Sequence, residues 1–215
     1  MNTQTRREVR SGLIALALSA LLFVLGIAWR GPGFTDPEGA IRAAASPVFV
    51  PAWTILLVGV VLQIYGYFGL YRYLTYQIES LIAFLAFVLS STGMVLFLPL
   101  NGFLPISLPV LAELYQQGNQ EVIAVVEANF TSGLALVLFG VSAVATIIGA
   151  ILFGIAIWRH GSLPKWTSVT YVLSVLLAFP ITFATELLGA VLYLISTGVI
   201  AWNVWQESAH PVKRL

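Results

Sequence analysis

The 215-residue chain is 59% hydrophobic and only 9% charged, whereas an ordinary soluble domain is roughly 25% charged. Because a soluble protein of this size needs polar residues to cover its surface, this composition indicates a surface that faces hydrocarbon. The net charge of +1 provides no basic field for nucleic acid, and the absence of cysteine excludes disulfides, thiolate nucleophiles and cysteine-ligated metals.

Six apolar runs each have about the 20 residues that a helix needs to cross about 30 Å of hydrocarbon. They predict membrane-spanning helices at 12–29, 50–71, 79–99, 132–157, 166–183 and 186–205. Charged residues fall at the ends of these runs or between them, as expected when a charge at the bilayer centre costs about 2.5–3.5 kcal/mol. The sequence therefore predicts an all-α polytopic membrane bundle, with residues 1–215 as a single transmembrane domain.

The first run follows three arginines, as the apolar core of a signal peptide would. It ends at Trp29 and Arg30 instead of the small residues of a cleavage site, so we interpret it as a retained span. In the next link, Asp36-Pro37-Glu38 is typical of a helix start, with a cap, a proline at the first position and an acid in the first turn. We expect a short outer helix there.

The second span carries polar groups in an otherwise apolar run, namely Gln63, Tyr65 and Tyr67. Together with Glu186, they could line a small polar cavity. The simpler alternative is that such groups bond across helices, for up to about 1.7 kcal/mol each. The sequence leaves both interpretations open.

The outer segment 101–131 alternates prolines with apolar pairs that acidic residues separate. This spacing predicts short amphipathic helices that lie on the membrane or roof the bundle. Glu127 and Asn129, at the entrance of the fourth span, are candidates for an intramembrane site or for a solvent-exposed helix start.

The fourth span has small residues four positions apart, at Ser142, Thr146, Ala150 and Gly154. Residues at this spacing share one helix face, so a neighbouring helix can approach closely. We expect this strip to pack within the bundle, and the alternative is a face for association with a second copy.

The fifth and sixth spans form a nearly continuous run that Pro180 and the stretch 182–186 interrupt. A tight outer turn with Thr185 as the helix cap would place Glu186 in the first turn of the last helix, against the positive end of its dipole. We expect Glu186 to be solvent-exposed there, although an intramembrane carboxylate would be a proton or cation site.

The link before the fifth span reads Trp-Arg-x-Gly-x-Leu-Pro-x-Trp over residues 158–166, and Leu188-Gly189-Ala190 leads the run that ends at Trp202. This last third of the chain resembles a broad group of uncharacterised prokaryotic membrane proteins of about this size. The resemblance implies a bacterial or archaeal plasma membrane and transfers no catalytic residue.

Basic residues set the expected orientation, because cytoplasmic loops carry an excess of them. Eight of the ten fall on one predicted face: Arg6, Arg7, Arg10, Arg72, Arg159, Lys165, Lys213 and Arg214. That face is expected to be cytoplasmic, with both termini on it, in the inner membrane of a prokaryote. Trp29 and Trp53 are predicted at the outer interface, and the inner interface is predicted to hold Trp158, Trp166, Trp202 and Trp205.

The spans carry no recognisable catalytic constellation, and both histidines, His160 and His210, fall in a link and a tail. We therefore expect a non-enzymatic membrane component that needs no cofactor or metal and serves as an accessory subunit or a scaffolding or binding protein. Its expected partners are the lipid bilayer and a membrane protein or second copy, not nucleic acid. One alternative is a small carrier with its polar site between spans two and five. Another is an intramembrane enzyme that uses the outer carboxylates Glu127 and Glu186 with Asn129.

Overall fold

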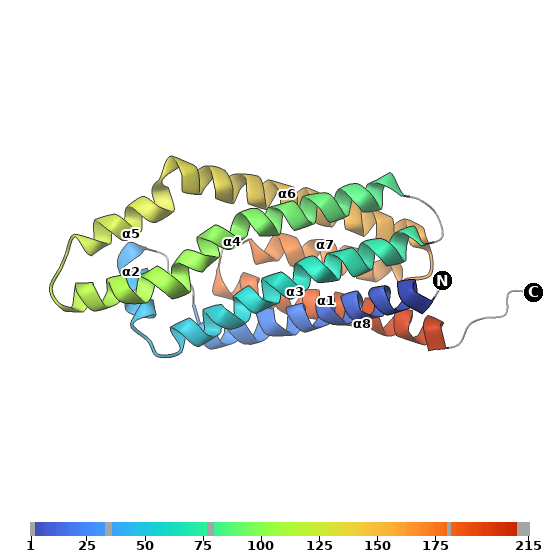
Figure 1. Ribbon diagram of the computed structural model, residues 1–215, viewed down its shortest axis with the longest axis horizontal. Helices are drawn as coiled ribbons and strands as arrows, with labels where there is room; N and C mark the ends of the chain where they lie inside the picture. Colours follow the sequence, from blue (N-terminus) through green and yellow to red (C-terminus); the bar gives the residue numbers. More distant parts are fainter. Residues whose placement is uncertain (1–2, 33–35, 77–79, 180–181, 210–215) are drawn as a thin grey trace, which may run out of the picture.

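A computed structural model describes residues 3–32, 36–76, 80–179 and 182–209 (Figure 1). All regular structure in these residues is α-helical. The helices are α1 (Thr3–Arg30), α2 (Pro37–Ala44), α3 (Phe49–Thr75), α4 (Leu81–Gln116), α5 (Val122–Thr131), α6 (Gly133–His160), α7 (Lys165–Ala178) and α8 (Phe183–Ala209).

Within the described residues, five helices are long and apolar enough to cross a membrane: α1, α3, α4, α6 and α8. The predicted fifth span is a shorter helix. At 14 residues, α7 is about 21 Å long, less than the roughly 30 Å of a hydrocarbon core. Phe179 has an extended backbone at ψ 112°, because a residue before proline is disfavoured in the helical conformation. Six full spans are thus not confirmed, and Pro180 itself lies outside the described residues.

Six helices form a closed ring in chain order (Figure 1). Each of α1, α3, α4, α6, α7 and α8 packs against the next, and α8 packs back against α1. The start of α1 and the end of α8 therefore lie at the same end of the molecule. We call this the basic end, and its basic residues include Arg6, Arg7, Arg10, Arg72, Arg159 and Lys165.

The ring is tightest between α1 and α3, where two glycines bring the backbones into contact. A Cβ atom added to Gly12 would lie 2.5 Å from the Cα atom of Gly69, and one added to Gly69 would lie 2.6 Å from the Cα atom of Gly12. No side chain fits in this space, so these glycines fix the distance between the two helices.

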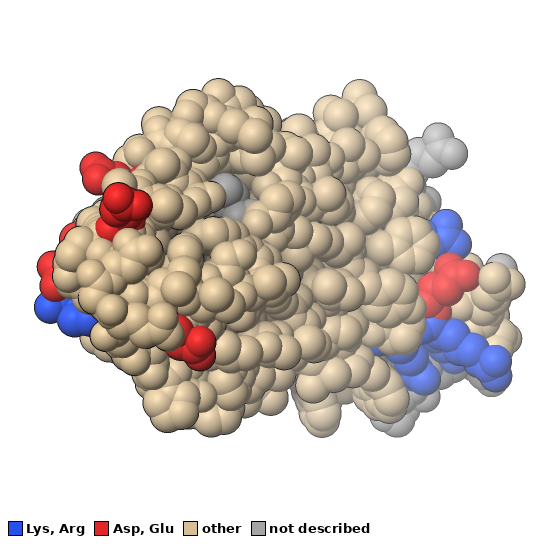
Figure 2. Space-filling model, turned by 60° about the vertical axis from the view of Figure 1, so that its left-hand side comes forward, with Lys and Arg blue, Asp and Glu red and all other residues tan. Residues whose placement is uncertain are grey.

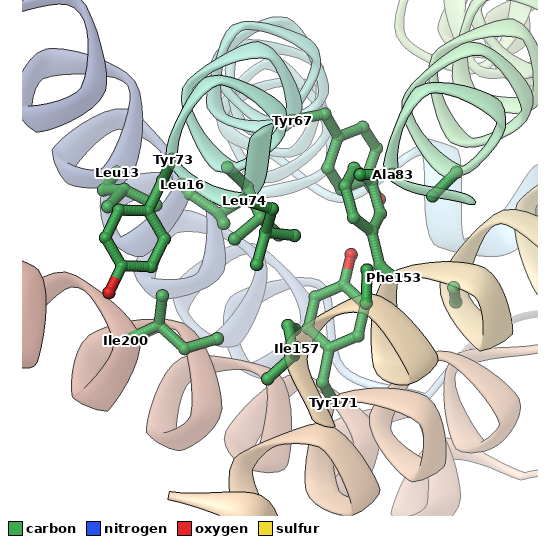
Figure 3. Close-up of a cluster of buried hydrophobic side chains, with 14 of the residues drawn as sticks. Leu13, Leu16, Tyr67, Tyr73, Leu74, Ala83, Phe153, Ile157, Tyr171 and Ile200 are labelled. Carbon is green, nitrogen blue, oxygen red and sulfur yellow. The ribbon is translucent and has the colours of Figure 1, made fainter. Parts of the chain in front are cut away.

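Large side chains fill the inside of the ring in the half nearer the basic end (Figure 3). Tyr67 of α3, Phe153 of α6 and Tyr171 of α7 are buried there, and Phe153 lies between the two tyrosines with ring centroids 5.6 and 6.3 Å away. Leu13 and Leu16 of α1 are fully buried beside them. Aromatic and aliphatic packing closes this half of the ring.

The other end carries a helical cap, made of α2, the part of α4 beyond Pro99, and α5. Asp36 caps α2 by accepting a hydrogen bond from the Gly39 backbone at 2.6 Å, which confirms the predicted helix start. The prediction of separate short helices over 101–131 is wrong in part. Helix α4 continues to Gln116 through three prolines and bends, and a separate short helix, α5, follows it (Figure 1).

Acidic side chains gather at this capped end, opposite the basic end (Figure 2). The residues concerned are Asp36, Glu38, Glu113, Glu121, Glu127 and Glu186, with Arg30 and Arg42 among them. Trp29 is half exposed, as an interfacial residue would be, whereas Trp53 is only 6% exposed. The prediction that Trp53 lies in an aromatic belt is therefore wrong, because the cap covers it.

Candidate functional site

A cavity of about 740 Å³ lies inside the ring, in the half nearer the cap. All six ring helices contribute to its wall, which is mostly apolar, with leucine and phenylalanine as the commonest residues. Its described polar lining is small: Arg30, Gln63, Asn101, Asn129, Ser132, Ser142, Thr146, Ser174, Glu186 and Tyr193. A volume of this size suits one small molecule, since ligand pockets occupy about 300–1,000 Å³.

An ion pair closes the ring at the capped end of this cavity. Arg30, the last residue of α1, donates from Nη2 to the Glu186 carboxylate of α8 at 2.5 Å, and the two side chains are 8% and 18% exposed. The guanidinium also lies 5.2 Å from the centre of the Trp53 ring. Because both charges are largely removed from water, each compensates the buried charge of the other. The pair therefore joins α1 to α8.

The floor of the cavity is a neutral hydrogen-bonded group centred on Gln63. Its Nε2 atom donates to the Tyr67 hydroxyl at 2.6 Å and to the Tyr193 hydroxyl at 3.0 Å. Its Oε1 atom is buried and has no hydrogen-bond partner, and Gln63 as a whole is only 6% exposed. A buried carbonyl without a donor costs about 1–3 kcal/mol, and this oxygen is enclosed by protein atoms instead of open to the cavity.

The ion pair and the floor lie at different depths. Trp53, under Arg30, precedes Gln63 by ten residues of α3, a rise of about 15 Å along the helix. Gln63 lies next to the midpoint of α3. The wall between the two levels includes Leu56, Leu57 and Val60, so an apolar stretch separates two polar levels.

The short helix α7 leaves the ring open on one side. Because α7 ends at Ala178, it accompanies only the part of α6 nearer the basic end, and the described parts of α6 and α8 do not touch. The uncovered part of α6 includes Leu134, Leu136 and Phe139, which line the cavity yet are 72%, 57% and 40% exposed. Figure 2 shows the surface hollowed in this half of the molecule. Asn129, Phe130 and Ser132 of the lining are exposed as well, so the described wall meets the surface around the α5–α6 junction.

The structure brings together some of the predicted cavity residues. Gln63 and Glu186 line the same cavity, and Tyr67 is bonded to Gln63 directly beneath it. Tyr65 does not belong to this group. Since it follows Gln63 by only two residues, it points away from the ring, is 45% exposed and bonds to the Ser11 hydroxyl at 2.8 Å.

The expectation of a solvent-exposed Glu186 is wrong, because its carboxylate is paired with Arg30. It does lie in the first turn of α8, but Thr182, not Thr185, caps that helix. The Thr185 backbone donates to the Thr182 hydroxyl at 3.2 Å, and the Thr182 backbone donates to the Thr185 hydroxyl at 3.1 Å. This reciprocal arrangement is a capping box and fixes the helix start.

The outer carboxylates do not converge on one point. Asn129 lines the cavity, and its Nδ2 atom donates to the Val125 carbonyl at 2.9 Å. Glu127 is exposed and is not part of the described cavity wall. Of the three residues of the enzyme hypothesis, Asn129 of α5 and Glu186 of α8 line the cavity and Glu127 does not.

The small-residue strip of α6 packs inside the bundle, mainly against α4. Ser142 donates to the Gly93 carbonyl at 2.7 Å, and Thr146 lies against the same glycine. Further along, Ala150 is buried and Gly154 contacts Val172 of α7. This face is therefore covered by the chain itself, which leaves it unavailable to a second copy.

A second polar cluster ties three segments together at the basic end. The Tyr73 hydroxyl donates to Glu207 of α8 at 3.0 Å and lies 2.8 Å from the Ser162 hydroxyl in the α6–α7 link. Ser162 in turn bonds to His160, whose ring lies against Tyr73 in a tilted arrangement with a centroid distance of 4.7 Å. These contacts hold α3, α6 and α8 together where the ring meets the basic surface.

Sequence reasoning did not identify Arg30 as a cavity residue, whereas Asn101, a polar residue at the end of the third apolar run, was a candidate and does line the cavity. A signal for Arg30 was present, since it ends the first apolar run on the predicted outer side, the same side as Glu186. Opposite charges at two span ends on one side of a membrane are candidates for an ion pair. Comparison with family models, curated proteins and solved structures finds no match to this chain.

Proposed function

We propose that this chain is an integral membrane protein that binds one small, mostly apolar molecule inside its helical ring, as a carrier or binding component. The observation that carries the proposal is the cavity of about 740 Å³, with largely apolar walls and the hydrogen-bonded group of Gln63, Tyr67 and Tyr193 at its floor. Ligand sites in proteins commonly combine apolar walls with a few well-placed polar groups. No redox or hydrolytic chemistry is required of these residues.

The arrangement of the helices supports a carrier in particular. Helices α3 and α7, the predicted spans two and five, both line the cavity. The polar floor lies near the midpoint of α3, and the short α7 leaves an interrupted wall. Secondary transporters also place their sites near the bilayer midplane, beside discontinuous helices. In this proposal the chain passes the membrane six times, and its fifth pass is the short α7.

The charge distribution supports an orientation. The basic end, which carries most of the lysines and arginines of the described residues, faces the cytoplasm in this proposal, and the cap faces outward. Both termini are then cytoplasmic. The resemblance of the last third to prokaryotic membrane proteins supports a bacterial or archaeal plasma membrane.

The proposal is tested by native mass spectrometry of the protein released from nanodiscs. The wild type is expected to retain one small molecule per chain. Ala190→Phe places a ring in the cavity, where Ala190 is a buried wall residue, and is expected to lose the molecule. Val144→Phe is the matched control, because Val144 of α6 is 57% exposed and lies outside the wall.

Three results are informative. Loss of the molecule from Ala190→Phe alone supports the cavity as the site. An empty wild type, or retention by both variants, contradicts the proposal. A stable complex with a second kind of protein and no small molecule would instead support an accessory subunit.

A further inference from the structure

We infer that a groove on the outer surface of the ring, between α6 and α7, binds an anionic phospholipid, with the lipid phosphate at Arg159 and Lys165 and one acyl chain along the groove. This inference goes beyond the proposed function. It rests on the membrane insertion that the proposed function includes, and it does not depend on the ligand of the inner cavity.

The groove lies between two rows of exposed apolar side chains. It has a volume of about 480 Å³ and follows the contact of α6 with α7, which lie side by side (Figure 1). Its small lining residues, Gly154 of α6 and Ser168 of α7, are buried. A Cβ atom added to Gly154 would lie 2.5 Å from the Val172 Cγ2 atom, so no side chain rises between the helices at this level. The exposed apolar lining residues are Ile151, Ile155 and Trp158 of α6, and Val169 and Leu173 of α7.

The positive charges of the groove lie at one end of it. Arg159 lies in the last turn of α6 and lines the groove, and Lys165 is the first residue of α7. The Lys165 Nζ atom lies 5.2 Å from the centre of the Trp158 ring, which is itself part of the lining. Ile151 and Leu173 are each eight residues from these cations, a distance of about 12 Å along the helices. The groove is therefore amphipathic, with a cationic end and an apolar stretch about 12 Å long.

The protein itself does not neutralise these two cations. Both side chains are exposed, and no acidic side chain among the described residues lies within 4 Å of either. Other arginines of the basic end have partners. Arg72 pairs with Glu8 at 3.2 Å, and Arg10 lies 4.5 Å from the centre of the Trp205 ring. The end of the groove is thus complementary to an anion.

The two properties together select an anionic phospholipid. In a bilayer the exposed apolar side chains face lipid chains, and the basic end lies at the depth of the headgroups. One acyl chain can then lie along the groove while the phosphate contacts both cations, as basic pockets between membrane helices bind anionic headgroups. A zwitterionic lipid brings an ammonium group close to the same cations, which weakens the attraction. A free phosphate ion has no part that fits the apolar stretch.

The experiment measures the affinity for the first lipid bound, by native mass spectrometry of the full chain with phosphatidylglycerol or phosphatidylcholine of identical acyl chains. We expect the wild type to bind phosphatidylglycerol about fivefold more tightly, or more. Arg159→Gln should weaken this binding about fivefold, which corresponds to about 1 kcal/mol for one basic residue near a membrane surface. Arg7→Gln is the matched control, because it removes one exposed charge of the same basic end outside the groove. It should change the affinity by less than about twofold.

A second pair of variants tests the apolar part of the groove. Val169→Trp places a ring in the groove and keeps both cations, so it should also weaken phosphatidylglycerol binding about fivefold. Val144→Trp is its control, since Val144 of α6 is 57% exposed and lies outside the groove. A monodisperse elution profile and the unfolding temperature of the wild type verify that each variant is folded.

Four results would overturn the inference. Equal binding of the two lipids, or equal losses from Arg159→Gln and Arg7→Gln, would show that the basic end attracts anions as a whole. Unchanged binding by Val169→Trp, or complete displacement of the lipid by inorganic phosphate, would show that no acyl chain occupies the groove. The proposed function is tested separately, by the small molecule lost from Ala190→Phe, so either proposal can fail alone.

Discussion

The two halves of the ring use the same six helices in different ways. Near the basic end, glycine contacts and buried aromatic side chains fill the inside. Near the cap, the same ring encloses a cavity, and an ion pair holds α1 to α8. Apolar packing and polar contacts occur in both halves, since a second hydrophobic cluster lies under the cap and the Tyr73 cluster lies at the basic end. The comparison teaches that a helical bundle can be filled at one end and hollow at the other when the wall helix α7 is short.

The largest expected effect is in the filled half. Gly69→Leu places a side chain where the Gly12 backbone already lies, and neither helix can yield without separating from the other. We expect a loss of stability beyond the usual overpacking cost of about 1–3 kcal/mol, and little monodisperse protein. Thermal unfolding in detergent measures it.

The matched control is Gly140→Ala on α6, where nothing lies within 4 Å of the added methyl group. It should be neutral or stabilise the helix by up to about 1 kcal/mol. If the Gly69→Leu variant has the same unfolding temperature as the wild type, the backbones of α1 and α3 are not in contact at these glycines.

In the hollow half, removal of one charge of the Arg30–Glu186 pair should lower the free energy of unfolding by nearly as much. Glu186→Gln leaves Arg30 buried against Trp53 without a counter-ion, and such losses cost about 3–5 kcal/mol. Replacing both partners, as Arg30→Met with Glu186→Met, should recover most of the stability because no lone charge remains. Denaturant titration of both variants tests this, and a double variant as unstable as the single one would rule out a paired role.

Gln63→Leu should change stability far less. It removes two hydrogen bonds, worth about 0.6 kcal/mol each in a membrane bundle, and also removes a buried carbonyl that costs about 1–3 kcal/mol. We expect the free energy of unfolding of the empty protein to stay within about 1–2 kcal/mol of the wild type. A large destabilisation would show that the fold depends on this hydrogen-bonded group.

The smallest effect is expected at the helix contact between α4 and α6. Ser142→Ala removes one bond to the Gly93 carbonyl and leaves the packing of the small strip intact. The free energy of unfolding should fall by about 0.6 kcal/mol, and by no more than about 1.7 kcal/mol. Thermal unfolding against the wild type provides the measurement, and a cost near that of Glu186→Gln would contradict the ranking.

Local signals in the sequence predicted much of the helical architecture. The length of the apolar runs predicted the five long helices, and Asp36-Pro37 predicted the start of α2. The end of α7 was harder to predict, since a proline can either bend a membrane helix or end it. Here Phe179 is extended and the helix stops. In α4 the opposite holds, because the helix continues through Pro99, Pro105 and Pro109.

The site was predictable only in part, because its key contacts join distant segments. Gln63 was recognisable as a polar residue in an apolar run. The partner of Glu186 was not, since Arg30 precedes it by 156 residues and no local pattern connects them. The burial of Trp53 likewise depends on the cap, which brings α2 and the far end of α4 over α3.

The closure of α8 onto α1 has a consequence for biogenesis. Synthesis proceeds at about 5–20 residues per second, so the ribosome needs roughly 8–30 s to travel from Arg30 to Glu186. Throughout that interval the nascent chain carries Arg30 without the carboxylate that pairs with it. Insertion of the final helix is then the step that completes the ring, and chains truncated before it should be recognised by membrane quality control as unassembled.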